Sequence, residues 1–449
     1  MNTKARATFG SRLGVILATA GSAVGLGNIW RFPYIVGESG GAAFIILYFV
    51  CILILGLPVM ISEFYIGRST NKNAAGAFKA LAPKSMWSVI GYNGVLASIL
   101  ILGFYSVIAG WTLEYLYNSF AGNIVGKSVE EFQSEFELFS TDIVRPILST
   151  AGFLLLTHVI IVMGVEKGIE KASKVMMPLL FLLLILLGIH SMTMDGASAG
   201  LEFLFKPDFS KIDSSTALSA MGQAFFSLSI GMGCLITYSS YFSKQTNIQR
   251  VSLQVSLIDS FVAILAGVMI FPAVFSFGIE PTAGPELVFI TLPNIFAQMN
   301  GGTFWAIAFF LLLALAALTS TISLHEVATV YFHEELNMSR QKATLVVTLC
   351  ALSIGVISSL SMGIWKEYTI FGLTIFDAID HLTAKFMLPL GGLFICLFIS
   401  RRIDKKILKA ELTNKGSLPF YFFNTYVFLV RWVAPVLILL VFLKELNLF

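Results

Sequence analysis

The chain has 449 residues, of which 57% are hydrophobic and only 12% are charged. A soluble globular domain carries about 25% charged residues, so most of this chain must lie in lipid or in buried protein. Its net charge of +3 is small and is spread along the chain, which argues against nucleic acid as a partner. The four cysteines lie within apolar runs without C-x-x-C spacing, and we interpret them as buried hydrophobic residues.

Apolar runs long enough to cross a bilayer recur from one end of the chain to the other. They predict eleven membrane helices, at 12–36, 42–68, 87–118, 145–164, 170–190, 217–241, 251–278, 303–332, 342–360, 369–399 and 420–443. The first run resembles a signal peptide, with basic residues before it and "ATA" at 18–20. Because the apolar character resumes beyond that point, we interpret it as a membrane helix that is retained.

The basic residues predict how the helices are oriented. They gather before the first span and in the second-to-third, fourth-to-fifth and tenth-to-eleventh connections, at Lys4, Arg6, Arg12, Arg68, Lys72, Lys79, Lys84, Lys167, Lys171, Lys174, Arg401, Arg402, Lys405, Lys406 and Lys409. These connections share one side of the membrane, and basic residues favour the cytoplasmic side. The N-terminus is therefore expected in the cytoplasm and, with eleven spans, the C-terminus outside.

Two of the predicted spans are interrupted by glycine and polar residues. "TAGSAVGLGNIWRFPY" at 19–34 lies within the first span, and "MGQAFFSLSIGMGCLITYSSYF" at 221–242 makes up most of the sixth. The first span begins one group of five helices, and the sixth begins a second group. Interruptions at matching places in two halves indicate a transporter built from inverted repeats. Bare peptide groups cost several kcal/mol each in hydrocarbon, so such breaks are expected to hold a ligand. The alternative is that these glycines only let helices pack closely.

The first interrupted segment is also the clearest family signature. "RLGVILATAGSAVGLGNIWRFP" resembles the first helix of the neurotransmitter:sodium symporter family, and the resemblance continues through "GWTLEY" at 110–115, "GQAFFSLSIGMG" at 222–233 and "ALTSTISL" at 317–324. It covers nearly the whole chain. It implies an all-α polytopic membrane protein with the 5+5 inverted-repeat leucine-transporter fold, an eleventh helix, and helices one and six unwound at mid-membrane.

The expected domain organisation follows from this fold. It comprises a cytoplasmic N-terminal segment, a first five-helix repeat, an extracellular connection, a second five-helix repeat, and a cytoplasmic loop with the eleventh helix, at 1–11, 12–190, 191–216, 217–400 and 401–449. Many relatives have a twelfth helix, which bears on oligomer contacts, and a homodimer is left open.

The resemblance implies two sodium sites made of oxygen atoms, the ligands that suit a hard cation. The first would use Ala23, Asn28, Ser227 and Asp259, together with the substrate carboxylate. The second would use Gly21, Val24, Ala316, Thr319 and Ser320.

Asp259 also bears on chloride. Many relatives have Asn at this position, and a carboxylate at membrane depth by default marks a functional site. Chloride-dependent relatives bind the anion near positions that match Tyr48, Gln223 and Ser227, with a serine at the position of Ala263. We expect the Asp259 carboxylate to replace chloride, so that two sodium ions and no chloride are used.

The resemblance also implies a substrate pocket, lined by Ser22, Ala23, Leu26, Gly27, Ile101, Tyr105, Phe226, Ser229, Met232, Ser323 and Leu324. The Tyr105 hydroxyl and backbone N–H groups near Gly27 would hold the substrate carboxylate. Monoamine transporters have Asp at the position of Gly25, which stands in for the carboxylate that their substrates lack. With glycine there and an apolar lining, we expect a neutral, hydrophobic L-amino acid, aromatic ones included.

Gates are implied on both sides of the pocket. On the outside, Arg31 and Asp380 match the ion pair of the family, and Phe226 would form a lid below them. Asp377 lies one turn away and could pair with Arg31 instead of Asp380. Inside, the matching latch is made of Arg6, Ser240, Tyr241 and Glu334. Relatives use the spacing of Gly168 and Pro178 to unwind the fifth helix, although a plain proline kink explains it equally well.

The function that we expect is sodium-coupled symport of amino acids by alternating access, in the bacterial cytoplasmic membrane. The alternatives are a proton-coupled carrier of the same fold and a cation channel. An enzyme is not expected: "HEVAT" at 325–329 begins like the H-E-x-x-H zinc motif, but Thr329 stands where the second histidine must be. The expected partners are a small amino acid and the lipid bilayer.

Overall fold

The structure is a computed structural model that describes residues 7–124, 126–278 and 287–445. Its regular structure in these ranges is helical, apart from an isolated bridge between Ile370 and Leu373. Nine helices in the described ranges are long and apolar enough to cross a membrane, and a bent pair at the start of the chain makes a tenth span. The remaining predicted span, 217–241, consists of two short helices separated by a break.

The first half of the chain begins with the bent pair. Its halves meet at 52° and are α1 (Arg12–Ala23) and the continuous η1 (Gly27–Arg31) and α2 (Phe32–Glu38). The next four spans are α3 (Ala42–Cys51) with η2 (Ile52–Gly56) and α4 (Leu57–Thr70), α6 (Ser88–Phe120), α8 (Arg145–Val162), and η3 (Val165–Glu170) with α9 (Lys171–Ser191). Two short helices lie between them, α5 (Ala74–Leu81) and α7 (Val129–Thr141).

The second half repeats this order. Its five spans are α11 (Ser214–Ser227) with α12 (Cys234–Ser239), α13 (Ile248–Ser276), α15 (Gly302–Glu335), α16 (Arg340–Leu360), and α17 (Ile375–His381) with η6 (Leu382–Met387) and α18 (Leu388–Arg402). Short helices precede or connect them: α10 (Ala197–Phe205), η4 (Phe209–Lys211), η5 (Leu287–Thr291) and α14 (Leu292–Gln298). After α19 (Lys405–Leu412), the last span is α20 (Phe423–Phe428), η7 (Leu429–Val433) and α21 (Ala434–Glu445). Each half thus opens with a broken helix, as the 5+5 fold requires.

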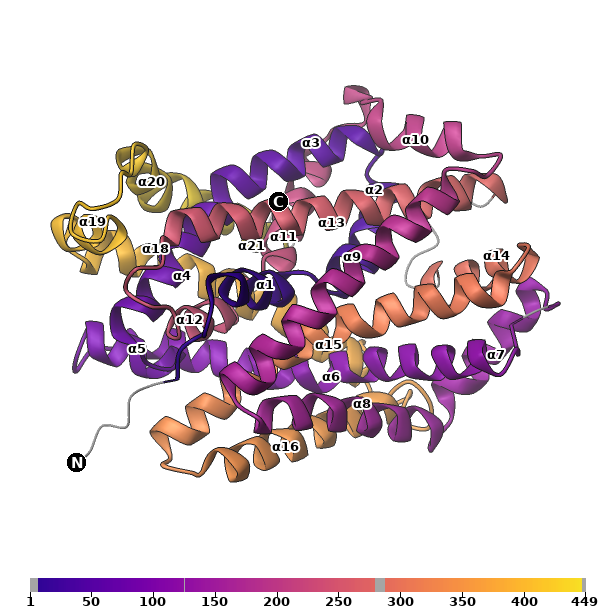
Figure 1. Cartoon of the computed structure of the whole chain (residues 1–449), viewed down its shortest axis with the longest axis horizontal. Coiled ribbons are helices and arrows are strands. Elements are labelled where there is room, and N and C mark those ends of the chain that lie inside the picture. Colours follow the sequence, from indigo (N-terminus) through magenta and orange to yellow (C-terminus); the bar gives the residue numbers. More distant parts are fainter. Residues whose placement is uncertain (1–6, 125, 279–286, 446–449) are drawn as a thin grey trace.

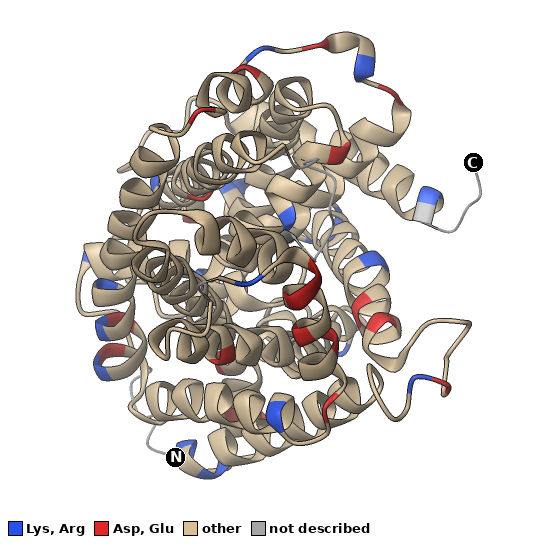
Figure 2. Ribbon diagram, turned by 90° about the vertical axis from the view of Figure 1, so that its right-hand side faces the viewer, with Lys and Arg blue, Asp and Glu red and all other residues tan. Residues whose placement is uncertain are grey.

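The broken helices lie inside a shell of continuous ones. Helices α6 and α15 pack along one another, and α8 and α16 pack against them (Figure 1). Helix α1 contacts α9, α13 and α15, while α12 packs on α4 and α11 packs on α3. Seen from one end, most helices run toward the viewer and surround the middle of the molecule (Figure 2). The two breaks are therefore shielded from lipid by other helices.

The second break is built from residues that hold a left-handed backbone. Ser229, Gly231 and Gly233 have φ angles of 54°, 84° and 79°. A Cβ added at Gly231 would lie 2.3 Å from the Leu388 carbonyl oxygen, so glycine is needed there both for its conformation and for space. This is why an otherwise apolar helix stops after Ser227 and restarts at Cys234.

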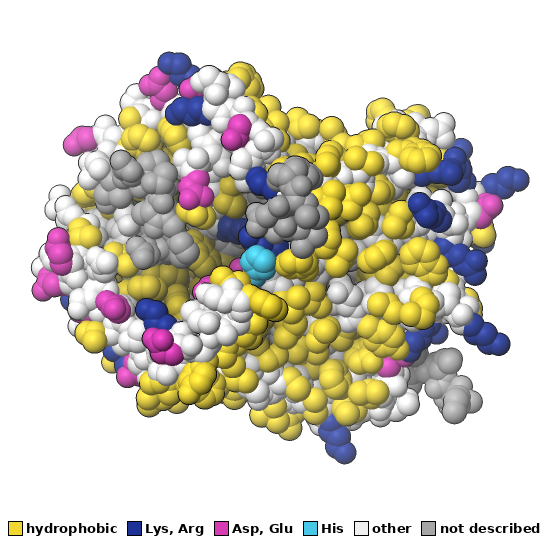
Figure 3. Space-filling view, turned by 180° about the vertical axis from the view of Figure 1, so that it is seen from behind, with side chains coloured by type: hydrophobic (Ala, Val, Ile, Leu, Met, Phe, Trp, Pro, Cys, Tyr) yellow, Lys and Arg dark blue, Asp and Glu magenta, His cyan; other side chains and the backbone are white. Residues whose placement is uncertain are grey.

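Charge is unevenly divided between the two ends of the molecule. Lys and Arg gather at one end and many Asp and Glu at the opposite end (Figure 3). The first of these ends carries α5 and α19 (Figure 1), and we call it the basic end. Between the two ends, hydrophobic side chains cover much of the surface, and Leu155, Leu182, Leu257 and Phe261 are each at least half exposed. Such a belt is the surface expected of a protein in lipid.

Candidate functional site

The two breaks meet each other at the centre of the molecule. The Ser229 hydroxyl in the second break donates a hydrogen bond to the carbonyl of Ser22, at 2.7 Å. The Gln223 side-chain amide on α11 donates to the carbonyl of Gly27, at 3.1 Å. Carbonyl groups in or beside one interruption thus accept hydrogen bonds from polar side chains in or beside the other, and these bonds hold the two segments together.

The residues predicted for the first sodium site come together from α13 and the two breaks. The Asn28 amide nitrogen lies 2.7 Å from Asp259 Oδ1 and 3.1 Å from the Ser227 hydroxyl oxygen. The Ser227 hydroxyl lies 2.9 Å from both Asp259 carboxylate oxygens, and Tyr48 donates to Oδ2 at 3.1 Å. All four side chains are buried.

This cluster has the character of a cation site. The buried Asp259 carboxylate accepts hydrogen bonds from three neutral side chains, those of Asn28, Ser227 and Tyr48. These neutral donors do not cancel its negative charge. In addition, α1 ends at Ala23 and α11 ends at Ser227, and the carboxyl end of a helix carries partial negative charge. Hard oxygen donors, a carboxylate and two helix ends fit a sodium ion.

The residues predicted for the second sodium site bridge α1 and α15. The Thr319 hydroxyl lies 3.0 Å from the Val24 carbonyl oxygen and 2.8 Å from that of Ala316. A Cβ added at Gly21 would lie 3.4 Å from the Thr319 Cβ, and one added at Gly25 would lie 2.2 Å from the Ser320 hydroxyl. The five predicted residues thus fall on one α1–α15 contact, whose oxygen atoms are all uncharged.

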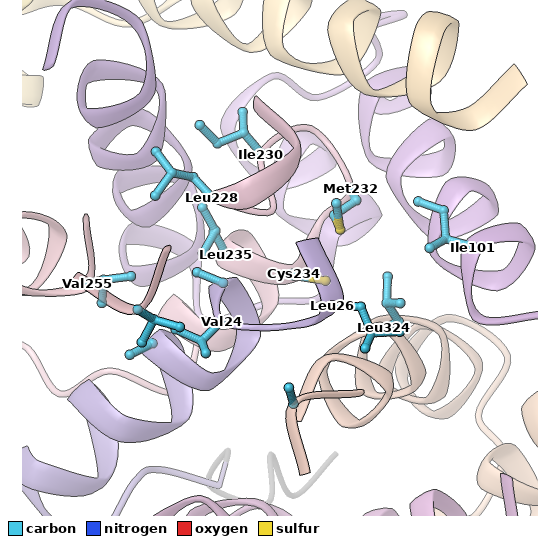
Figure 4. Packing of buried hydrophobic residues seen from close by; sticks show 14 of the residues in the cluster. Val24, Leu26, Ile101, Leu228, Ile230, Met232, Cys234, Leu235, Val255 and Leu324 are labelled. Carbon is cyan, nitrogen blue, oxygen red and sulfur yellow. The ribbon is translucent and has the colours of Figure 1, made fainter. Parts of the chain in front are cut away.

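A small cavity of about 40 Å³ lies beside these oxygen clusters. It is lined by ten of the eleven residues predicted for the substrate, Ser22, Ala23, Gly27, Ile101, Tyr105, Phe226, Ser229, Met232, Ser323 and Leu324, and also by Gly25 and Ser320. Leu26 is not in that lining, but its backbone N–H donates to the Tyr105 hydroxyl at 3.2 Å. Figure 4 shows three residues of this lining, Ile101, Met232 and Leu324, together with Leu26.

A second cavity, of about 270 Å³, lies on the other side of Phe226. Its lining includes Arg31, Asp377 and Asp380. The Arg31 guanidinium sits over the Phe226 ring, 4.4 Å from its centroid. Phe226 lines both cavities, whereas Arg31 and the two candidate aspartates line only the second one.

The predicted inner latch is described only in part, because Arg6 lies outside the described residues. The Tyr241 hydroxyl donates to Glu326 at 2.7 Å, and Glu326 also pairs with Arg340 at 2.6 Å. One carboxylate oxygen of Glu334 accepts from the backbone and side-chain N–H groups of Asn73, at 2.9 Å each. The role of Arg6, Ser240, Tyr241 and Glu334 as a latch stays a prediction.

The histidine of "HEVAT" has a structural environment. His325 is buried, with its ring nitrogens 2.9 Å from the hydroxyls of Thr329 and Thr348. The described residues contain no group of three or more His, Cys, Asp and Glu side chains that could hold a metal ion. His325 and Glu326 thus make their contacts within α15 and with neighbouring helices.

Sequence reasoning missed one residue that contacts the second break from another helix. Glu63 on α4 is fully buried, and its Oε1 accepts the backbone N–H of Gly231 at 2.8 Å. This bond satisfies a peptide group that the break leaves without a helical partner. The signal was present, because Glu63 is a carboxylate within the apolar run 42–68.

The start of the fifth span, η3 (Val165–Glu170), is helical in this structure. Gly168 lies in η3, a π-helical segment, and Pro178 lies inside α9. Glu170 joins this segment to the beginning of α1, because its carboxylate accepts from the Gly10 N–H at 2.6 Å and from the Ser11 hydroxyl at 2.7 Å. Single-turn π-helices are frequent at functional sites.

Comparison with known proteins decides the family. A model of the sodium:neurotransmitter symporter family matches residues 6–137 and 142–449. The chain belongs to this family. The family resemblance and the fold predicted from the sequence are thus confirmed, and the members of the family are membrane transporters rather than enzymes.

Individual relatives agree with this assignment along nearly the whole chain. An uncharacterized sodium-dependent transporter of Bacillus subtilis, YhdH, is 40% identical over 97% of this chain and 96% of its own. One of Haemophilus influenzae is 36% identical over 99% of both chains. A crystal structure of MhsT in complex with L-phenylalanine matches with a TM-score of 0.91 and 45% identity, over 98% of this chain and 100% of the other.

Proposed function

We propose that this symporter couples the inward movement of two sodium ions to the uptake of a neutral, hydrophobic L-amino acid, aromatic ones included, without chloride. The observation that carries the proposal is the buried Asp259 carboxylate, which lies with Asn28 and Ser227 where the two broken helices end. Burying a charge without an opposite charge is costly, and a bound cation removes that cost.

The cavity beside Asp259 suits an amino acid that brings its own carboxylate. The Tyr105 hydroxyl and the Leu26 N–H lie at its edge, and both can donate to an oxyanion. Gly25 has no room for a side chain, so the protein itself does not supply a carboxylate from that position. The remaining lining is largely apolar, and the related MhsT was solved with L-phenylalanine.

Two sodium ions are supported by two oxygen clusters of different character. The cluster around Asp259 is anionic, while that between Val24, Ala316 and Thr319 is neutral. Each sodium ion that enters down a potential of 100 mV supplies about 2.3 kcal/mol, so two ions can drive strong accumulation of a neutral zwitterion. A proton-coupled carrier would have no need of the second, neutral cluster.

Independence from chloride rests on the same carboxylate. Tyr48 and Ser227, which match the anion-binding positions of chloride-dependent relatives, are hydrogen-bonded to Asp259. Ala263, one turn further along α13, is buried and has no hydroxyl with which to hold an anion. The negative charge that chloride supplies elsewhere is therefore already part of this protein.

The orientation of the protein in the membrane follows from its charge. We place the basic end, with α5 and α19, in the cytoplasm of a bacterial cell and the opposite end outside. The cavity of Arg31, Asp377 and Asp380 then faces outward, as a vestibule above the Phe226 ring.

Uptake of labelled L-phenylalanine into proteoliposomes tests the proposal. Accumulation should require a sodium gradient, should fail when choline replaces sodium, and should persist when gluconate replaces chloride. Accumulation driven by a proton gradient in choline would instead favour the proton-coupled carrier. A sodium current without accumulation of any of the twenty amino acids would favour a channel.

A further inference from the structure

A wide cleft opens at the basic end, away from the substrate cavity. It has a volume of about 520 Å³ and lies between the start of α1, the α12–α13 connection and the start of α13. Its lining residues are Phe9, Gly10, Ser11, Arg12, Val15, Ser243, Gln245, Thr246, Asn247, Arg250, Val251 and Leu418. The transport mechanism proposed above does not use these side chains.

The charge in this cleft is entirely positive. Arg12 and Arg250 are exposed, and in the described part of the chain neither guanidinium has a hydrogen-bond or ion-pair partner. The nearby carboxylates, Glu166 and Glu170, contact Gly10 but do not line the cleft. Glu170 is moreover engaged by Ser11 and by Lys174. The cleft thus offers two fork-shaped donors to an anion.

The cleft lies close to an exposed apolar stripe on α13, because Arg250, which lines it, is three residues before Leu253. Its wall includes the apolar side chains of Phe9, Val15, Val251 and Leu418. Below Arg250, α13 presents Leu253, Leu257 and Phe261 at intervals of one turn, with exposed fractions of 45%, 59% and 50%. Arg250 therefore stands at the head of an exposed apolar stripe. A free phosphate ion could use the arginines but not the stripe, whereas a phospholipid could use both.

We propose that this cleft binds the phosphate headgroup of an anionic phospholipid, with Arg12 and Arg250 on the phosphate and an acyl chain along Leu253, Leu257 and Phe261. The site lies at the base of α1, the helix whose end carries the sodium ligands. A lipid held between α1 and α13 would therefore join the cytoplasmic half of the broken helix to its neighbour.

Lipid titration of the purified full chain in detergent, followed by native mass spectrometry, tests this site. The wild type should bind phosphatidylglycerol more tightly than the zwitterionic phosphatidylcholine. A basic residue near an anionic lipid surface contributes about 1 kcal/mol, which corresponds to roughly fivefold in affinity. R12Q/R250Q should therefore lose phosphatidylglycerol affinity by more than about tenfold, and R12K/R250K should keep most of it.

A matched control removes two other exposed charges from the same end. K405Q/K406Q on α19 should bind phosphatidylglycerol like the wild type. Equal losses in the two Gln variants, or no loss in R12Q/R250Q, would overturn the proposal. So would displacement of the lipid by an equal concentration of inorganic phosphate, which would identify a soluble ligand. If the double Gln variant does not fold, R12Q and R250Q alone should each lose about fivefold.

Discussion

At the scale of single residues, the chemistry concentrates on Asp259. Its carboxylate accepts hydrogen bonds from Asn28, Ser227 and Tyr48, and these three groups come from different segments of the chain. Because these donors are neutral, they orient the charge without cancelling it. We infer that the carboxylate serves both as a ligand of the first sodium ion and as the fixed negative charge of the site.

Replacing Asp259 with Asn should therefore weaken sodium binding while keeping the shape of the side chain. A hydrogen bond or contact to a charged group contributes about 1.5–3 kcal/mol, so the sodium concentration for half-maximal amino-acid binding should rise roughly tenfold or more. Equilibrium binding of labelled L-phenylalanine across a sodium series measures this. D195N removes an exposed carboxylate and should leave the sodium curve unchanged; an unchanged curve in D259N would contradict the assignment.

Substitutions at Gly25 and Gly222 test how tightly the side chains pack around Gly25, because only Gly25 has close neighbours. A Cβ at Gly25 would lie 2.2 Å from the Ser320 hydroxyl and 3.3 Å from the Tyr105 hydroxyl, whereas one at Gly222 on α11 would meet nothing within 4 Å. G25A should destabilise the protein by about 1–3 kcal/mol and lower substrate affinity, because well-packed sites do not absorb extra atoms. G222A should be neutral or stabilising by up to about 1 kcal/mol, since alanine favours the helix.

Thermal unfolding with and without sodium and L-phenylalanine compares these two variants. If G25A is stabilised by the two ligands as strongly as the wild type is, the close contact between the first break and α15 is not part of the binding site.

At the scale of elements, the interrupted helices depend on side chains from continuous ones. The second break leaves the Gly231 N–H without a helical partner, and Glu63 on α4 accepts it at 2.8 Å. The first break is fastened in a similar way, because Thr319 on α15 donates to the Val24 carbonyl. The unwound segments are thus held as fixed parts of the site by their neighbours.

Removing the acceptor at Glu63 should loosen the second break. E63A leaves the Gly231 N–H buried and without its acceptor, at a cost of about 1–3 kcal/mol, and should lower both stability and substrate affinity. E63Q retains an acceptor oxygen and should behave more like the wild type. Thermal unfolding and L-phenylalanine binding of the two variants measure this, and equal losses in both would show that the charge matters rather than the hydrogen bond.

At the scale of the whole molecule, the uneven charge of the two ends should set its orientation in the membrane. Lys405 on α19 and Glu137 on α7 are exposed, and these two helices lie at opposite ends of the molecule (Figure 1). Basic residues are retained on the cytoplasmic side during insertion. In the proposed orientation, the Arg12 and Arg250 cleft would face the cytoplasmic leaflet, whose anionic headgroups would attract it.

Cysteine labelling in intact cells tests this orientation. In a background without the four native cysteines, E137C should react with a membrane-impermeant maleimide added from outside. K405C should react only after the cells are opened. The reverse labelling pattern would show that the orientation is opposite, with the Arg31 cavity facing the cytoplasm and the Arg12 and Arg250 cleft facing outside.

Much of the fold was predictable because hydropathy is a local property of the chain. The eleven apolar runs each correspond to a span of the structure, and the glycine-rich interruptions at 19–34 and 221–242 correspond to the two broken helices. The residues of the pocket were predictable only through the family resemblance. Glu63 was missed because nothing in its own run shows that Gly231, 168 positions away, needs an acceptor.

The sequence by itself determined the class of the protein, because a chain this apolar can lie only in a membrane, and clustered glycine and polar residues inside an apolar run weaken a helix at that point. The tertiary structure alone decided which groups meet. Asn28 and Asp259 are 231 positions apart, and Tyr48 and Asp259 are 211 apart. Their contact depends on how η1, α3 and α13 pack, and no local pattern records the packing of distant helices.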